Sequence, residues 1–238
     1  MNRVDVPGVM IEGYNYSGKS TLAKVVADDL RARGLTVHES HGTFTHEGIT
    51  DSLFRQALVD FADISEEEGS TRPFPDPDLL RRFDALKAAQ LMIDAELTRT
   101  GSAVDPAAVY VQDRYWLTQY TGNFVLSPGE EFLTRSWMQQ RAPRFTVQIY
   151  LTCTDETRQK RCDARGAAAE KHVLNSYLRH NLDGVIEMDR ITVDLIRDDP
   201  TWTVLYSDEL GPQELSGRVM ELFTAAYGAD ERNARSPE

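Results

Sequence analysis

The chain has 238 residues, and its 38 acidic against 26 basic side chains give a formal net charge of −12. Such a charge repels a nucleic-acid backbone, so we expect no DNA or RNA polymer as a partner. No window approaches the ~20 apolar residues that cross a bilayer, which predicts no membrane association. Cys153 and Cys162 have neither zinc-site spacing nor a disulfide pattern, which favours a cytoplasmic protein.

Short apolar runs alternate with longer stretches of helical spacing along the chain. The expected strands are Val9–Glu12, Leu35–His38, Val109–Gln112, Thr146–Leu151 and Thr203–Tyr206. The expected helices are Lys19–Arg33, Asp78–Arg99, Asp155–Arg165, Ser176–Arg197 and Pro212–Tyr227. This alternation predicts an α/β protein with three layers, a five-stranded parallel sheet and helices on both faces.

We expect a single domain over residues 1–228 and a flexible polar tail over 229–238. The acidic residues 66–68, with the proline-rich stretch 73–77 that follows, are interpreted as a surface loop. No internal repeat divides the chain.

The segment Gly13-Tyr14-Asn15-Tyr16-Ser17-Gly18-Lys19-Ser20 matches the phosphate-loop pattern G-x-x-x-x-G-K-[ST]. It follows an expected strand and opens an expected helix, as the mechanism of phosphate binding requires. The pattern therefore predicts a P-loop NTPase fold that binds ATP and Mg²⁺, with Lys19 on the terminal phosphates and Ser20 on the metal. The residues expected to contact ATP are Gly13, Asn15, Tyr16, Ser17, Gly18, Lys19, Ser20 and Thr21.

The third expected strand leads into Asp113-Arg114-Tyr115, at the carboxyl end of the sheet. Asp113 is a candidate Mg²⁺ ligand, and Arg114 a candidate partner for an acceptor phosphate. A structural ion pair at a strand end is the alternative interpretation. No Asn-Lys-x-Asp guanine-reading motif is present, which disfavours a GTPase.

Glu39 is expected to end the second strand, in the same crevice as Glu12 and Asp113. A kinase acting on a hydroxyl would use such a carboxylate as a base, whereas a phosphate acceptor needs cations more. A plain surface role for Glu39 is the alternative.

Arg158, Lys160, Arg161 and Arg165 form a basic cluster on one expected helix. In this acidic protein the cluster predicts a lid near residues 158–172 that closes over ATP and stabilises the transferring phosphoryl group. A solvated helix face, paired with nearby acids, is the alternative.

With these motifs the chain resembles the thymidylate kinase group of nucleoside monophosphate kinases, and more distantly the deoxynucleoside kinases. Ile11-Glu12-Gly13, leading into Ser17-Gly18-Lys19-Ser20-Thr21, is similar to the opening of both groups. Asp113-Arg114-Tyr115 resembles the family's Asp-Arg-Tyr/His element. The segment 150–166 resembles its fourth strand and lid helix, with Arg161 and Arg165 at positions similar to the lid arginines.

The stretch from Phe83 to Gln90 resembles a family helix motif whose arginine contacts the acceptor phosphate, and Lys87 stands at that position here. Asn15 likewise stands where the family usually has an aspartate near the acceptor sugar. The resemblance implies a small acceptor bound by Glu12, Lys87, Arg114 and Tyr115. It also implies a homodimer, because related kinases are dimers.

Together these features predict ATP-dependent phosphoryl transfer to a nucleoside monophosphate, thymidylate-like, or to a similar small acceptor. Two other functions stay open on the sequence alone. One is a kinase for the hydroxyl of a nucleoside or a non-nucleotide metabolite, with Glu39 as base. The other is a regulatory protein that binds a nucleotide without transferring phosphate.

Overall fold

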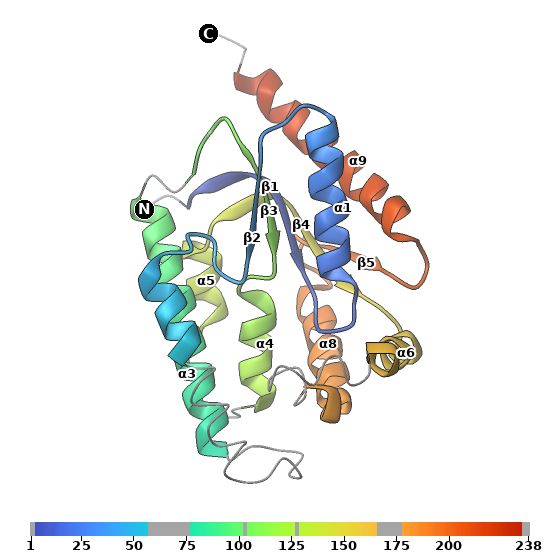
Figure 1. The fold of residues 1–238 in the computed structure, drawn as a ribbon. Helices are drawn as coiled ribbons and strands as arrows, with labels where there is room; N and C mark the ends of the chain where they lie inside the picture. Colours follow the sequence, from blue (N-terminus) through green and yellow to red (C-terminus); the bar gives the residue numbers. More distant parts are fainter. Residues whose placement is uncertain (1–2, 57–76, 102–103, 127–128, 166–177, 235–238) are drawn as a thin grey trace.

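The computed structural model describes residues 3–56, 77–101, 104–126, 129–165 and 178–234. Five strands form one parallel sheet in the order β2-β3-β1-β4-β5, so the first strand of the chain lies at its centre (Figure 1). The strands are β1 (Asp5–Glu12), β2 (Val37–His41), β3 (Val109–Asp113), β4 (Arg144–Thr152) and β5 (Thr203–Tyr206). The predicted α/β class and parallel five-stranded sheet are confirmed.

Helices cover both faces of the sheet, as predicted. Helices α1 (Lys19–Ala32) and α9 (Pro212–Ala234) pack side by side on one face (Figure 1). The opposite face is covered by α3 (Pro77–Thr100), α4 (Leu117–Leu126), α5 (Arg135–Arg141) and α8 (Leu182–Ile196). Helix α6 (Asp155–Arg165) follows the carboxyl end of β4.

The two-residue repeat of the central strands creates these layers. In β1, Val9 and Ile11 enter the core under α1 and α9, whereas Met10 enters the core on the other face. In β3, Val111 and Tyr110 divide in the same way. Both faces of the central strands are therefore buried, as expected of parallel strands covered by helices on either side.

Two elements have the bounds that the sequence predicts. The predicted helix Asp155–Arg165 is α6, and the predicted strand Thr203–Tyr206 is β5. The second strand was placed too early, because its end is polar and β2 runs on to His41. Helix α9 continues past the predicted Tyr227 to Ala234, so 229–234 are helical.

Helices α4 and α5, and the helical residues 48–56, were not predicted. Helix α4 has the sequence LTQYTGNFVL, rich in β-branched and aromatic residues with a central glycine, and such residues have weak helix propensity. Its Leu117 and Tyr120 are buried in the core, so packing holds this helix. Helix α5 has seven residues and begins after Thr134, whose side chain accepts the N–H of Trp137.

Several predictions fall on residues that the structure does not describe. The expected loop over 66–76 is one of these, and α3 begins directly after it. The expected lid, 158–172, coincides with α6 as far as Arg165, and the rest lies outside the described residues. Within the described ranges, no helix combines the length and apolarity needed to cross a membrane.

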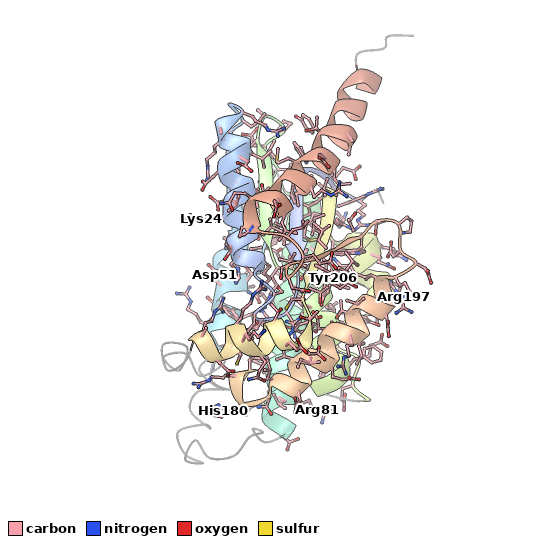
Figure 2. All side chains as sticks on the ribbon, turned by 90° about the vertical axis from the view of Figure 1, so that its right-hand side faces the viewer. Lys24, Asp51, Arg81, His180, Arg197 and Tyr206 are labelled. Carbon is pink, nitrogen blue, oxygen red and sulfur yellow. The ribbon has the colours of Figure 1, made fainter. Side chains whose placement is uncertain are left out.

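Side chains fill the space between the layers, and the charged Lys24, Arg81 and Arg197 lie on the outside (Figure 2). The carboxyl ends of all five parallel strands meet at one edge of the sheet. At that edge β1 has β3 on one side and β4 on the other, which makes it the point where the strand order reverses. Ligands of open α/β sheets bind at such a crevice.

Gly8 in β1 lies close to the backbone of β3, and a substitution there tests how tightly the two strands pack. A Cβ atom there would lie 2.1 Å from the carbonyl oxygen of Tyr110, so Gly8→Ala forces the strands apart. We expect a loss of about 2–4 kcal/mol in the free energy of unfolding, measured by denaturant titration. Gly217→Ala in α9 meets no atom within 4 Å and should be neutral or stabilising by up to ~1 kcal/mol. Equal effects of the two substitutions would contradict this packing.

Candidate active site

The loop between β1 and α1 has a backbone that only certain residues adopt readily. Gly13 has a φ of 148° and Gly18 a φ of 94°, both favourable mainly to glycine. A Cβ at Gly13 would also lie 2.3 Å from the carbonyl oxygen of Leu151. Tyr16 has a φ of 69°, which costs a bulky residue energy and persists where the surroundings enforce it.

Two arginines of α6 hold the carbonyl groups of this loop. Arg158 Nη1 donates to the oxygen of Asn15 at 2.5 Å, and Arg161 Nη1 donates to those of Tyr16 and Ser17 at 3.1 and 2.9 Å. A trans peptide unit points its N–H away from its C=O. The N–H groups of Tyr16 and Gly18 are therefore turned to the opposite side of the loop, whereas that of Ser17 already donates to the Tyr14 oxygen at 3.3 Å.

The first turn of α1 adds donors on the same segment. Gly18 is the N-cap without a side-chain hydrogen bond, and the first turn contains no acidic residue. Both features leave the positive end of the helix dipole and its N–H groups without an internal partner. A concave set of amides of this kind suits a phosphate.

Lys19 lies beside these amides and is 8% exposed. Burial, together with the charge of Arg114, lowers its pKa to about 7, against the opposing influence of Asp113 and Glu12. An anion placed next to the ammonium group would stabilise its charged form. The side chain is therefore buried at an energetic cost that a bound phosphate would offset.

Asp113 ends β3, where its backbone is in register with Ile11 of β1. Its Oδ2 lies 3.1 Å from His41 Nδ1, and its buried Oδ1 has no hydrogen-bond partner. Burial raises its pKa, but His41, Lys19 and the Ser20 hydroxyl outweigh this effect and lower it to about 2. An ionised carboxylate with an unpartnered oxygen next to a serine hydroxyl fits a hard cation such as Mg²⁺.

Arg114 follows Asp113 with a φ of 65°. Its guanidinium Nη2 donates to Asn15 Oδ1 at 2.8 Å. Arg114 borders a cavity of about 160 Å³ that adjoins the phosphate loop. Lys87 lies at the same cavity, where its Nζ donates to Gln90 Oε1 at 2.6 Å, and burial together with Arg114 lowers its pKa to about 7.

Two further hollows adjoin the phosphate loop. One, of about 450 Å³, includes Ser20, Glu39 and Asp113. The other, of about 340 Å³, includes Thr21 of α1 and Arg165 of α6 and reaches the start of α9. Three hollows thus adjoin the loop and the first turn of α1.

Glu12 was predicted to bind the acceptor, and its surroundings in the structure contradict that role. Its side chain is fully buried, and its carboxylate accepts the N–H groups of Tyr115 and Leu117 at 3.0 and 2.8 Å and the Thr118 hydroxyl at 2.9 Å. Burial raises its pKa, and these hydrogen bonds oppose that shift. Glu12 therefore shapes the turn from β3 into α4, and a ligand could not reach it.

Glu39 is a second correction. It lies two residues before the end of β2 and pairs with Arg31 of α1. It borders the same hollow as Asp113, as predicted, but not Glu12, which is fully buried. The residue that ends the strand beside Asp113 is His41, which the sequence analysis did not select. Because the sequence of β2 is largely polar, it does not show at which residue the strand ends.

Arg161 braces the loop and also lines the hollow that includes Arg165. Besides the two loop carbonyls, it donates to the hydroxyl and carbonyl oxygens of Ser207 at 2.7 and 2.9 Å. Arg165 lies with its guanidinium carbon 5.3 Å from the centre of the Tyr16 ring. Tyr115 is 2% exposed and borders the same cavity as Arg114.

The sequence analysis placed Arg158 only in a basic cluster, whereas the structure buries it completely. Its Nη2 lies 2.9 Å from Asp189 Oδ2 of α8, and Tyr150 donates a hydrogen bond to the other oxygen at 2.8 Å. Spacing along α6 does not reveal this pair, because Asp189 lies 31 positions away in the sequence. The pair fixes the arginine that holds Asn15.

The chain matches no protein-family model and no curated protein. The predicted kinase resemblance therefore stays a prediction. Among the described residues, no group of three or more histidine, cysteine or acidic side chains forms a metal cluster. Mg²⁺ bound with a polyphosphate needs only one or two protein ligands, so this observation is compatible with Ser20 and Asp113.

Arg158→Met tests the buried pair. It leaves the Asp189 carboxylate without its cation, and we expect a loss of about 3–5 kcal/mol in the free energy of unfolding. Arg190→Met on α8 removes a solvent-exposed pair with Asp155 and should cost less than ~1 kcal/mol. Denaturant titration of both variants makes the comparison, and similar costs would show that the buried pair does not stabilise the fold.

Proposed function

We propose that the chain is an ATP- and Mg²⁺-dependent kinase that phosphorylates a nucleoside monophosphate or a similar small acceptor. One observation carries this proposal. The loop carbonyls are held by Arg158 and Arg161, so the N–H groups of Tyr16 and Gly18 point to the other side of the loop. Oriented amides, a helix N-terminus and a buried lysine together form the chemistry that binds a polyphosphate.

In this proposal the residues of the loop bind and orient the donor. The backbone of 13–20 holds the phosphates, and Lys19 neutralises negative charge that develops during transfer. Mg²⁺ would be held by Ser20 and Asp113, directly or through water, and would neutralise part of the phosphate charge. The hollow between Thr21 and Arg165 provides room for the nucleoside of the donor.

The acceptor is assigned to the cavity that borders Arg114 and Lys87. Arg114 and Lys87 favour an anionic acceptor there, and the adjacent loop would bring the two substrates together. Glu39, the base of the hydroxyl-kinase alternative, pairs with Arg31 and does not border this cavity, but the carboxylates of Asp51 and Asp84 do, so that alternative stays open. A nucleotide-binding regulator has no need of a second cavity with these cations.

Lys19→Met tests the donor site. It removes the ammonium group but keeps much of the side-chain volume, so we expect phosphoryl transfer to fall by about 100-fold or more. The measurement is ATP consumption with a panel of nucleosides and nucleoside monophosphates. The matched control is Lys24→Met, at an exposed position on the same helix, which should keep at least half of the activity.

Unchanged turnover in Lys19→Met would rule out the donor site. A wild-type protein that phosphorylates nucleosides in preference to monophosphates would favour the hydroxyl kinase instead. Stable MgATP binding without any phosphorylated product would favour the regulatory protein.

Proton uptake provides an independent test that needs no acceptor. With a pKa of about 7 in the free protein, Lys19 is mostly neutral at pH 8. Phosphate charge raises the pKa of a neighbouring lysine, so the side chain gains a proton on binding. Calorimetry at pH 8, in buffers of different ionisation enthalpy, should give an uptake of about 0.5–1 proton per ATP.

Lys19→Met cannot take up this proton, so the uptake should disappear if the variant retains measurable binding. Proton release, or an equal uptake in the variant, would contradict the position of Lys19 next to the phosphates.

A further inference from the structure

His41 and Asp113 end two neighbouring strands at the same level of the sheet. Strands β2 and β3 are parallel, and these two residues are partners in their register. The N–H of Gly42 donates to the carbonyl oxygens of Asp113 and Arg114 at 3.1 and 3.2 Å, so the backbone stays joined just beyond the strands. The sheet itself therefore brings the side chains of His41 and Asp113 together.

The contact between the two side chains engages one oxygen of the carboxylate. His41 Nδ1 lies 3.1 Å from Asp113 Oδ2. A carboxylate only accepts hydrogen bonds, so Nδ1 is the nitrogen that carries the proton in this contact. The imidazole is 65% exposed, whereas the Asp113 side chain is 12% exposed. The contact thus joins an outer, exposed group to an inner carboxylate.

The other oxygen of this carboxylate has no partner. Asp113 Oδ1 is buried and forms no hydrogen bond. Such an oxygen costs free energy unless a ligand supplies the missing contact. The other carboxylates that line this hollow, Asp28 and Glu39, both pair with Arg31 of α1. Among the residues that line the hollow, Asp113 is therefore the carboxylate that a cation can use.

The α1 side of Asp113 is occupied by the two residues that the proposed function assigns to the donor. The ammonium group of Lys19 and the hydroxyl of Ser20 both act on this carboxylate. Lys19 is assigned to the phosphates and Ser20 to the metal. A metal-binding carboxylate is commonly oriented by a hydrogen bond from a residue that does not bind the metal itself. His41 is placed to form this bond from the β2 side.

We infer that His41 is a positioning residue for the metal, because it engages Oδ2 of Asp113 and leaves Oδ1 to a divalent cation. This inference rests on the proposed kinase function and adds to it a residue that no sequence pattern indicates. His41 also borders the cavity assigned to the acceptor. A test must therefore measure binding of the metal separately from binding of the acceptor.

Two substitutions of His41 separate the hydrogen bond from the shape of the side chain. His41→Phe keeps a ring of similar size but has no donor. His41→Asn is smaller, but its amide nitrogen is as many bonds from the backbone as Nδ1 and can donate to Asp113.

The probe is Mn²⁺ in place of Mg²⁺, titrated into the protein in excess over a non-hydrolysable ATP analogue. The paramagnetic resonance signal of free Mn²⁺ measures the binding, and no acceptor or turnover is needed. We expect the Kd for Mn²⁺ to rise about tenfold in His41→Phe and less than twofold in His41→Asn.

His46→Phe is the matched control, because His46 is an exposed histidine that lines the same hollow. It should change the Kd for Mn²⁺ less than twofold. The Asp113→Asn background completes a double-mutant cycle, in which His41→Phe should cause no further rise. Should His41→Phe not fold, His41→Ala must show the same rise at this mostly exposed position.

The outcomes separate the inference from the function on which it rests. An unchanged Kd in His41→Phe, or an equal rise in His41→Asn or His46→Phe, would overturn the inference and leave the kinase proposal intact. A rise that persists in the Asp113→Asn background would also overturn it, because His41 would then act through another group. A wild-type protein that does not bind the ATP analogue would instead remove the proposed function itself.

Discussion

The site depends on the orientation of a few peptide groups between β1 and α1. Arg158 and Arg161 hold three consecutive carbonyl oxygens, so the N–H groups of Tyr16 and Gly18 are turned toward the opposite side. The arginines are positioned by more distant parts of the chain, through Asp189 on α8 and Ser207 after β5. The loop that is proposed to bind phosphate is therefore shaped by the whole carboxyl edge of the sheet.

Charge explains why a strongly acidic chain can suit an anionic ligand. The net charge is −12, yet Lys19, Lys87 and Arg114 lie together around the loop, and Arg114 disfavours the charged form of both lysines. A cluster of like charges with few ionic partners is costly in a protein that has nothing to bind there. Glu12 and Asp113 compensate it only in part, because each also has other partners.

The sequence predicted the sheet well because apolar runs and the phosphate-loop pattern are local signals. It failed for α4, whose weak helix propensity is overcome by burial of Leu117 and Tyr120. In the site, the phosphate-loop pattern selected Lys19 and Ser20, and the end of the third strand selected Asp113. The roles of Glu12, Arg158 and Arg161 depend instead on hydrogen bonds between residues more than 100 positions apart. Spacing along the chain cannot reveal such contacts.

The central claim is that main-chain amides of the loop bind a polyphosphate, and amide hydrogen exchange tests it most directly. On addition of MgATP, exchange should slow at residue 16 and at residues 18–21, because these N–H groups would gain phosphate acceptors, whereas the Ser17 N–H already donates to the Tyr14 oxygen. The strand residues 109–112, which are already hydrogen-bonded in the sheet, should change little and serve as the internal reference. If residues 16 and 18–21 exchange at the same rate with and without saturating MgATP, the proposed donor site is wrong.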